Sequence, residues 1–461
     1  MNSLRGSENR TRLIAVWSIA LGIMGLVGMF AYWRLRLAHQ VNRRFEQIKT
    51  AGLPANPAQL DKWYTAVPDA ENAALGLTQA FALMRTYPDR RSNDVTGFSF
   101  PPRGQSLTTE QKELLTGYIE LNSAALAKAL EAVKLPRSRY PVDLSKGTET
   151  LMPHLRPIRG LAELAREKAA MVSEAGNPAE ATSAIILILG LARTLEEEPI
   201  LISQIARIRL LQTATATLES ALAWNPLSGQ VLNDLAVAFA IAEKTNLMAR
   251  ALVGERASFV PYFRMSYAQL RRFSKMDDEG TDPRPPWPSS DQKPGVLRLS
   301  GFFERDLRLW LETFDGAIRL ASLPPPESLA ATNYFQRAST NSFKHYCFLS
   351  AILLPMFSRL AVTEAESFAH LRLAGIALAV EQFRLTKGRL PENLTDLAPQ
   401  FLSHLPTDPF DGAPLRFRRL PKGYVIYSVD LDRQDDGGRE KPEHKKSGDQ
   451  ASYDLTFTVE R

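Results

Sequence analysis

The sequence predicts a mainly α-helical protein with an N-terminal transmembrane helix, an irregular, repeat-like helical body and a small C-terminal α+β module with an antiparallel sheet. Three observations predict this fold class. Residues 13–32 are an apolar run without a charged side chain. From residue 69 to about 360, apolar residues recur at helical spacing between short breaks. Near the C-terminus, apolar and polar residues alternate, as in strands with one buried face.

Composition bounds the class of protein. The chain has 461 residues, enough for roughly two or three domains, and its 44% hydrophobic content is ordinary for folded protein. The net charge of +6 comes from basic and acidic residues that are mixed along the chain, so nucleic-acid binding is not indicated. The single cysteine, Cys347, excludes an internal disulfide framework.

Residues 13–32 predict a retained, single-pass signal anchor. As a helix rising ~1.5 Å per residue, the run spans about 30 Å, the thickness of a bilayer's hydrocarbon core. The alternative is a cleavable signal peptide, whose apolar region is usually only ~7–15 residues long and is followed by a small-x-small cleavage site. No such site follows here. Trp17, Tyr32 and Trp33 lie toward the two ends, where amphipathic rings favour the headgroups.

The segment after the anchor predicts a helical stalk, which completes a first unit of residues 1–50. Leu37, Val41, Phe45 and Ile48 recur every three or four residues and form one apolar stripe. The arginines on the other faces either lie against lipid phosphates or are simply solvated. Arginines on the two sides of the apolar run nearly balance, so charge alone does not orient the anchor.

Residues 51–273 predict an irregular α-helical domain. Its start signals are Asp69 as a helix cap, Thr108 and Gln111 as a capping box for a helix to about Leu135, and Gly176-Asn177-Pro178 as a stop followed by a start. Further helices are predicted from Pro199 to Asn225 and from Ser228 to about Arg250. No fixed repeat period is present, so side-by-side helical hairpins are expected without a regular array.

Residues 274–294 predict a Pro-rich linker, because prolines and a small acidic cluster leave almost nothing to pack. A second helical block follows at 295–362. The acidic cluster lacks the ligand spacing of a calcium loop and is interpreted as solvated.

No catalytic signature is present in the sequence. The six histidines include no HExxH and no HxH motif, and there is no GxSxG, no Gly-rich phosphate loop and no CxxC. His345 and Cys347 are two residues apart, so on a helix they would point to different faces. Glu196-Glu197-Glu198 before Pro199 is interpreted as charge at a helix boundary. We therefore predict no catalytic residues from sequence.

Residues 363–461 predict a helix packed on a small antiparallel sheet. Thr363 and Glu366 have capping-box spacing, and a continuous apolar face then runs from Ala369 to Phe383 until Gly388 ends the helix. Strands are expected around 415–418, 424–429 and 453–459, the first two joined by a turn at 420–423.

Residues 368–438 also carry an ordered series of short motifs: Phe383-Arg384, Gly388-Arg389-Leu390-Pro391, Pro406-Thr407-Asp408-Pro409, Gly412-Ala413-Pro414-Leu415 and Ser428-Val429-Asp430-Leu431-Asp432. In this order they resemble the globular domain of type II secretion major pseudopilins. The whole chain also resembles large membrane-anchored proteins of planctomycete- and verrucomicrobium-like bacteria, on Gly52-x-Pro54, residues 68–74 and the ending above.

The pseudopilin resemblance implies calcium at the loop after the second strand, with Asp432 as a ligand. Asp430, Asp435 and Asp436 could supply further hard oxygens. The alternative is a solvated acidic turn that ends in Gly437-Gly438. No other cofactor is predicted.

The resemblance further implies a bacterial inner-membrane protein with a periplasmic body. We expect a non-catalytic scaffold or assembly component of the cell envelope, related to secretion or pilus-like systems, which binds protein partners. The alternative is an anchored envelope enzyme with a site in the helical body. The charge balance alone would also allow a scaffold that faces the cytoplasm.

Overall fold

The computed structural model describes residues 2–85, 105–265, 300–442 and 452–461, and within them it confirms the predicted fold class. The predicted linker at 274–294 lies outside the described residues. The helices are α1 (Asn2–Thr50), α2 (Pro57–Trp63), α3 (Ala73–Leu83), α4 (Thr109–Leu121), α5 (Ser123–Ala132), α6 (Leu155–Glu174), α7 (Pro178–Arg193), α8 (Leu201–Trp224), α9 (Gly229–Ala242), α10 (Leu247–Phe259), α13 (Phe302–Ala321), α14 (Ala330–Lys344), α15 (Phe348–Leu353) and α16 (Leu360–Lys387).

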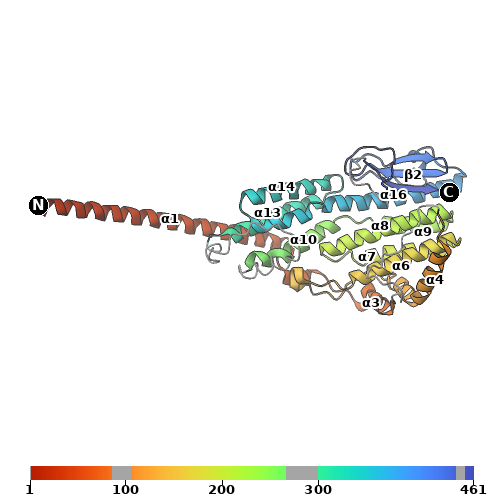
Figure 1. Ribbon diagram of the computed structural model, residues 1–461, viewed down its shortest axis with the longest axis horizontal. Helices are drawn as coiled ribbons and strands as arrows, with labels where there is room; N and C mark the ends of the chain where they lie inside the picture. Colours follow the sequence, from red (N-terminus) through yellow and green to blue (C-terminus); the bar gives the residue numbers. More distant parts are fainter. Residues whose placement is uncertain (1, 86–104, 266–299, 443–451) are drawn as a thin grey trace.

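The described part of the chain is elongated, with α1 projecting from one end and the sheet at the other (Figure 1). The apolar part of α1 is wholly exposed, as a single transmembrane or signal-anchor helix requires. The segment Phe348–Lys387 is also long and apolar enough to span a bilayer, but 56% of its apolar window is buried. The helix α16 within it is therefore a core helix of the body.

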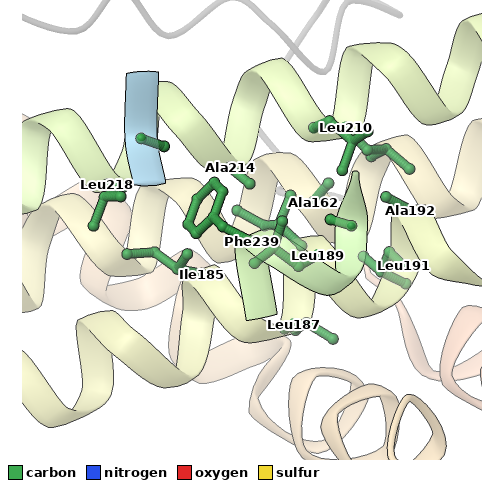
Figure 2. Packing of buried hydrophobic residues seen from close by; sticks show 14 of the residues in the cluster. Ala162, Ile185, Leu187, Leu189, Leu191, Ala192, Leu210, Ala214, Leu218 and Phe239 are labelled. Atoms are coloured by element: carbon green, nitrogen blue, oxygen red, sulfur yellow. The ribbon is translucent and has the colours of Figure 1, made fainter. Parts of the chain in front are cut away.

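The first hydrophobic core joins α6, α7, α8 and α9 to α16 and the sheet. Figure 2 shows the Phe239 ring of α9 among Ile185 and Leu189 of α7 and Ala214 of α8. In the same core, Gly190 permits the close approach of α7 to the end of α5. A Cβ atom on Gly190 of α7 would lie 2.6 Å from the Cβ of Val133.

The second core lies at the end of the body where α1 enters it. Trp310 of α13 is fully buried and contacts the rings of Phe259, Phe314 and Phe357. Leu37, Val41 and Ile48 of the predicted stripe are buried, and Phe45 packs against the same core, which confirms the stripe. The stalk is therefore part of the folded body.

The C-terminal sheet has the order β1 (Arg416–Leu420), β2 (Gly423–Ser428) and β3 (Leu455–Glu460), with both pairs antiparallel. The turn pairs Leu420 with Gly423, as predicted. The strand β2 is buried along its whole length because β1 and β3 flank it and α16 lies across it. On Gly423 a Cβ atom would overlap the carbonyl oxygen of Val459, so close strand pairing requires glycine there.

Several predicted helix boundaries are confirmed. Thr108 and Gln111 form a reciprocal capping box at α4. Gly176 has a left-handed φ of 76°, the Asn177 side chain accepts a hydrogen bond from the Glu180 amide, and Pro178 begins α7. Gly388, with a φ of 67°, ends α16.

Other predicted boundaries are wrong, because tertiary contacts decide them. Asn72, rather than Asp69, caps α3 by accepting from the Ala74 amide at 3.1 Å. The helix predicted to reach Leu135 is broken at Asn122, whose buried amide group bonds both the N–H and the C=O of Arg85.

Two further helix boundaries differ from the prediction. The helix predicted from Ser228 to Arg250 stops at Ala242, and Asn246 in a left-handed conformation precedes α10. Thr363 lies inside α16, where its hydroxyl bonds the Arg359 carbonyl, so it is no cap.

The two large cores run across the predicted domain boundaries. The first contains residues from both the 51–273 segment and the 363–461 module. The second joins the stalk to α10 and to the 295–362 block. The predicted division into separate units stays a prediction.

Candidate functional site

A buried polar cluster lies between α6 and the turn that precedes α8. The Nε2 atom of His154 lies 3.0 Å from one Glu198 carboxylate oxygen and 3.1 Å from the other, and the two side chains are only 5% and 1% exposed. The Tyr64 hydroxyl donates to Glu198 at 3.4 Å. Glu198 is thus not the solvated boundary charge that its sequence position suggests.

Aromatic rings close this cluster on its other side. Tyr140 stacks on His154 with ring centres 4.1 Å apart, and its hydroxyl lies 2.9 Å from the Thr194 hydroxyl. Burial, and then the charge of Glu198, raises the pKa of Tyr64; burial also raises the pKa of Tyr140. Both phenols therefore remain protonated and serve as hydrogen-bond donors rather than as bases.

The cluster resembles a catalytic constellation in its residue types but not in its access. All of its members are buried, and neither of the pockets described below is lined by them. Gln204 closes the turn beside it by donating to the carbonyls of Leu195 and Glu198 at 2.8 and 2.9 Å. The cluster thus ties the start of α8 to α6 and to the N-terminal elements.

A groove of about 320 Å³ lies between α5, α7, α8 and α9. Its walls are mainly apolar, formed by Leu130, Val133, Ile186, Leu189, Leu211, Val237, Ala238 and Ile241. Val237 and Ile241 are 59% and 51% exposed, so the groove opens beside an apolar strip of α9.

Charged side chains also line this groove, among them Arg193, Glu196 and Arg207. Arg207, only 5% exposed, donates to the Ala242 carbonyl at 2.7 Å and lies 3.7 Å from the Glu196 carboxylate. Arg193 donates to the carbonyls of Val133 and Leu135. Burial lowers the pKa of Arg207 and raises that of Glu196. Through these hydrogen bonds, Arg207 and Arg193 satisfy backbone carbonyls at helix ends that have no partner within the helix.

A smaller pocket lies beside the sheet. Five residues line it: Arg389, Leu390, Glu392, Arg419 and Leu420. Arg419 donates to the carbonyls of Leu390 and Pro391, so it already joins β1 to the segment after α16.

Where α1 enters the body, a row of polar contacts joins it to α13. Arg34 lies 2.8 Å from Glu304, Arg308 donates to Gln40 at 2.8 Å, and Arg44 lies 3.1 Å from Glu312. Glu304, Arg308 and Glu312 are spaced four residues apart and so share one face of α13. We call these six residues the clamp. Neither predicted alternative for the stalk arginines, lipid contact or solvation, describes Arg34 and Arg44.

The four predicted calcium ligands lie in the turn after β2. Asp430 has a left-handed φ of 57° and accepts from the Leu431 amide at 2.7 Å. Asp432 accepts from the Gln434 amide at 3.0 Å.

The other two predicted ligands are also engaged close by. Asp435 accepts from the Gly437 amide at 2.9 Å, and Asp436 accepts from the Ser452 hydroxyl at 2.5 Å. Each carboxylate thus holds its own piece of the turn. Over residues 2–85, 105–265, 300–442 and 452–461, no three His, Cys, Asp or Glu side chains are grouped so that they could hold a metal. As placed, the four aspartates do not fit a calcium cage, and the calcium site stays a prediction.

The motif residue Asp408 has a clear structural role. It is fully buried and accepts from the Ser428 hydroxyl at 2.9 Å, the Val429 amide at 3.0 Å and the Phe410 amide at 3.0 Å. Its other partner is the Arg416 guanidinium at 2.6 Å. One carboxylate thus joins the Pro-Thr-Asp-Pro turn to β1 and to the end of β2.

Comparison of the chain with protein-family models, with curated proteins and with solved structures finds no match. The function must therefore be argued from the geometry itself.

Proposed function

We propose that this protein is a non-catalytic scaffold or assembly component of the bacterial cell envelope, anchored in the inner membrane by α1 and related to secretion or pilus-like systems. The observation that carries the proposal is the clamp, together with the stripe beneath it. Through them the anchor shares a core with the body. A catalytic domain on a tether needs no such fixed attachment, whereas an assembly subunit must present its surfaces at a set height and angle.

The continuity of α1 supports a retained anchor. The helix runs unbroken from the apolar segment into the clamp, from Asn2 to Thr50. A cleaved signal sequence would end between the two, and residues 37–48 would then pack on α13 as the stub of a cut helix.

The C-terminal module supports the link to pseudopilin-like assembly. Its helix on a three-stranded antiparallel sheet is the arrangement that the resemblance implies, and it lies at the end of the body away from α1 (Figure 1). There it is available to dock onto a partner. The exposed Val237 and Ile241 on α9 offer a second apolar surface for a protein partner.

The groove favours the second candidate function, an anchored envelope enzyme. It is mainly apolar with a few charged groups, as ligand sites usually are. However, its buried arginine is committed to the α9 carbonyl and to Glu196. For this reason we rank the enzyme below the scaffold.

Reporter fusions test the location of the body. Alkaline phosphatase and, separately, a reporter that fluoresces only in the cytoplasm are fused after Glu460 of the full chain. The proposal expects phosphatase activity and a dark fluorescent fusion. The reverse pattern would move the body to the cytoplasm and remove the envelope role.

In-cell photo-cross-linking tests the scaffold role. A cross-linker at Val237 is compared with one at Leu151, which is 81% exposed and lies before α6. A scaffold gives a discrete protein adduct from a label at Val237. A label at the neighbouring Ile241 gives the same adduct, and Val237→Glu in that Ile241-labelled chain abolishes it. Equal adducts from both positions, or none, would contradict the scaffold.

A further inference from the structure

The connection between α14 and α15 forms an aromatic and basic tip at the end of the body where α1 enters. Residues 343–348 have the sequence Phe-Lys-His-Tyr-Cys-Phe. Phe343 and Tyr346 are 53% and 61% exposed, and Lys344 is exposed between them. Aromatic rings beside a lysine are the composition found at membrane–water interfaces.

Contacts with α13 place the tip close to the level at which α1 leaves its apolar span. Glu304 pairs with Arg34, two residues after Tyr32. The next residue, Arg305, donates to the His345 carbonyl in the tip. Asp306 accepts from the amides of Leu349 and Ser350 at 2.8 and 3.1 Å and so fixes the start of α15. Figure 1 shows this end of α14 near the point where α1 meets the body.

Because Glu304 and Arg305 are neighbours in α13, the tip lies near the level of Arg34, from which both the tip and the anchor can reach one bilayer surface. The headgroup layer on each side of the hydrocarbon core is ~5–8 Å thick. Because α13 lies between α1 and α14, packed helices at ~8–10 Å spacing put the tip ~16–20 Å from the anchor axis. A typical helix tilt of ~20°, if directed toward the tip, lowers the tip toward the bilayer by ~6 Å.

The backbone of the tip supports a role beyond chain reversal. Tyr346 has a φ of 55°, in the left-handed region where glycine or asparagine fits without strain. A tyrosine is unfavourable there, most of the residue is exposed, and its ring has one edge contact, with Phe348 at 6.3 Å between ring centres. Apart from this edge contact, the fold gains nothing from the side chain that glycine would not give.

We propose that the tip, residues 343–348, is a second membrane contact, in which Phe343 and Tyr346 enter the headgroup layer and Lys344 faces lipid phosphates. The inference rests on the proposed anchoring by α1. The anchor and the tip, with α13 between them, would together set the tilt of the protein in the bilayer. A single anchor helix, although fixed to the body, leaves this tilt free to vary. The favoured surface is an anionic bilayer, because the exposed charge of the tip is positive.

The test uses the full chain in liposomes that contain anionic lipid. Lys344→Cys and the control Lys422→Cys, each with Cys347→Ala, carry an environment-sensitive fluorophore. Lys422 is exposed in the turn between β1 and β2, at the far end of the body. Nitroxide-headgroup lipid should quench the label at 344 several-fold more than the label at 422. Equal weak quenching in protein that floats with the liposomes would overturn the tip contact and leave the anchor intact.

Two further outcomes keep the inferences separate. Protein that fails to float with the liposomes would overturn the anchoring and the tip contact together. A label at 344 that is shielded from lipid quencher in a larger oligomer would assign the tip to a second copy of the chain and overturn the lipid contact.

Tyr346→Gly provides the matched variant. Glycine removes the unfavourable left-handed tyrosine, so the melting temperature should hold or rise. Quenching of the label at 344 should nevertheless fall several-fold. Unchanged quenching in this variant would show that the ring makes no membrane contact.

Discussion

The guanidinium of Arg34 lies 2.8 Å from the carboxylate of Glu304, and this ion pair joins residues 270 positions apart. The two side chains are 26% and 37% exposed, so the pair lies at the edge of the second core rather than inside it. Its position matters more than its strength, because Arg34 is the first charged residue after the apolar span.

The clamp predicts a small but measurable coupling. Arg34→Ala and Glu304→Ala should each destabilise the chain, and the double variant should fall short of their sum by ~0.2–1 kcal/mol, as for other partly exposed pairs. Denaturant unfolding of the full chain in detergent measures this. Arg34→Ala with Glu312→Ala is the control, because Glu312 pairs with Arg44. A coupling as large in the control as in the pair would contradict a direct contact.

Asp408 predicts a large effect in the module. Asp408→Ala leaves two buried backbone amides and the Ser428 hydroxyl without their acceptor, so the free energy of unfolding should fall by about 3 kcal/mol. Asp432→Ala, in the exposed turn, should cost no more than ~0.5 kcal/mol. Thermal unfolding and proteolysis of the full chain compare them. Similar losses of stability in both variants would contradict the prediction that the hydrogen bonds of Asp408 stabilise the module.

Glu255 predicts a pH dependence of stability. Its carboxylate is buried and accepts from the Leu201 amide at the start of α8, and burial raises its pKa to about 7 from 4.5. Because the pKa is higher in the folded chain than in the unfolded chain, the protonated Glu255 carboxyl stabilises the fold. This stabilisation is complete below pH 4.5 and is lost as the pH rises through about 7. Between pH 5 and pH 8 wild type should therefore lose more stability than Glu255→Gln, by up to about 3 kcal/mol.

Melting temperatures at the two pH values measure this difference, with Glu131→Gln as a control whose side chain is 72% exposed. Burial also raises the pKa of Glu364 to about 7 and that of Asp306 to about 6. Their contribution to the pH dependence of stability should be the same in wild type and in Glu255→Gln. Identical pH slopes for wild type and Glu255→Gln would contradict the prediction.

Two helix glycines predict opposite effects of the same substitution. A Cβ on Gly254 of α10 would overlap the carbonyl oxygen of Pro199, so Gly254→Ala must push α10 from the turn before α8, at a cost of ~1–3 kcal/mol or more. Gly375 of α16 has nothing within 4 Å of such an atom, and Gly375→Ala should stabilise by ~0.5–1 kcal/mol. Melting temperatures that move in the same direction would contradict this packing.

The calcium hypothesis makes its own prediction. If the ion holds the turn after β2 to the sheet, saturating chelator lowers the melting temperature of the full chain, and added calcium restores it. Asp432→Asn should remove this dependence. An unchanged melting temperature in chelator would reject the calcium site and leave the local hydrogen bonds of the four aspartates as the full account of the turn.

The sequence predicts those parts of the fold that short-range patterns decide. The apolar stripe at Leu37, Val41 and Ile48, the cap at Asn177 and the turn at Leu420 to Gly423 depend on neighbours in the chain, and all three were predictable. The break at Asn122 was not, because its cause is a bond to Arg85, 37 residues away. Helical spacing continues through the break and hides it.

The candidate sites show the same limit more strongly. His154 and Glu198 are 44 residues apart, and each occupies an unremarkable position in the sequence. Only the packing of α6 against the turn before α8 brings them together. The sequence shows the stalk arginines, Arg34 and Arg44 among them, but nothing near them indicates partners on a helix at residues 302–321. The Pro-Thr-Asp-Pro motif did mark Asp408, although not the partners that it binds.

The joining of α1 to α13 has a consequence for synthesis. At ~5–20 residues per second, a ribosome needs roughly 15–50 s to make the segment between Arg34 and Glu304. During this interval α1 is already made, while α13, to which the clamp joins it, is not. A chain that stops before Phe302 lacks every clamp residue of α13. Incomplete chains therefore leave Arg34, Gln40 and Arg44 without the α13 partners that they have in the finished chain.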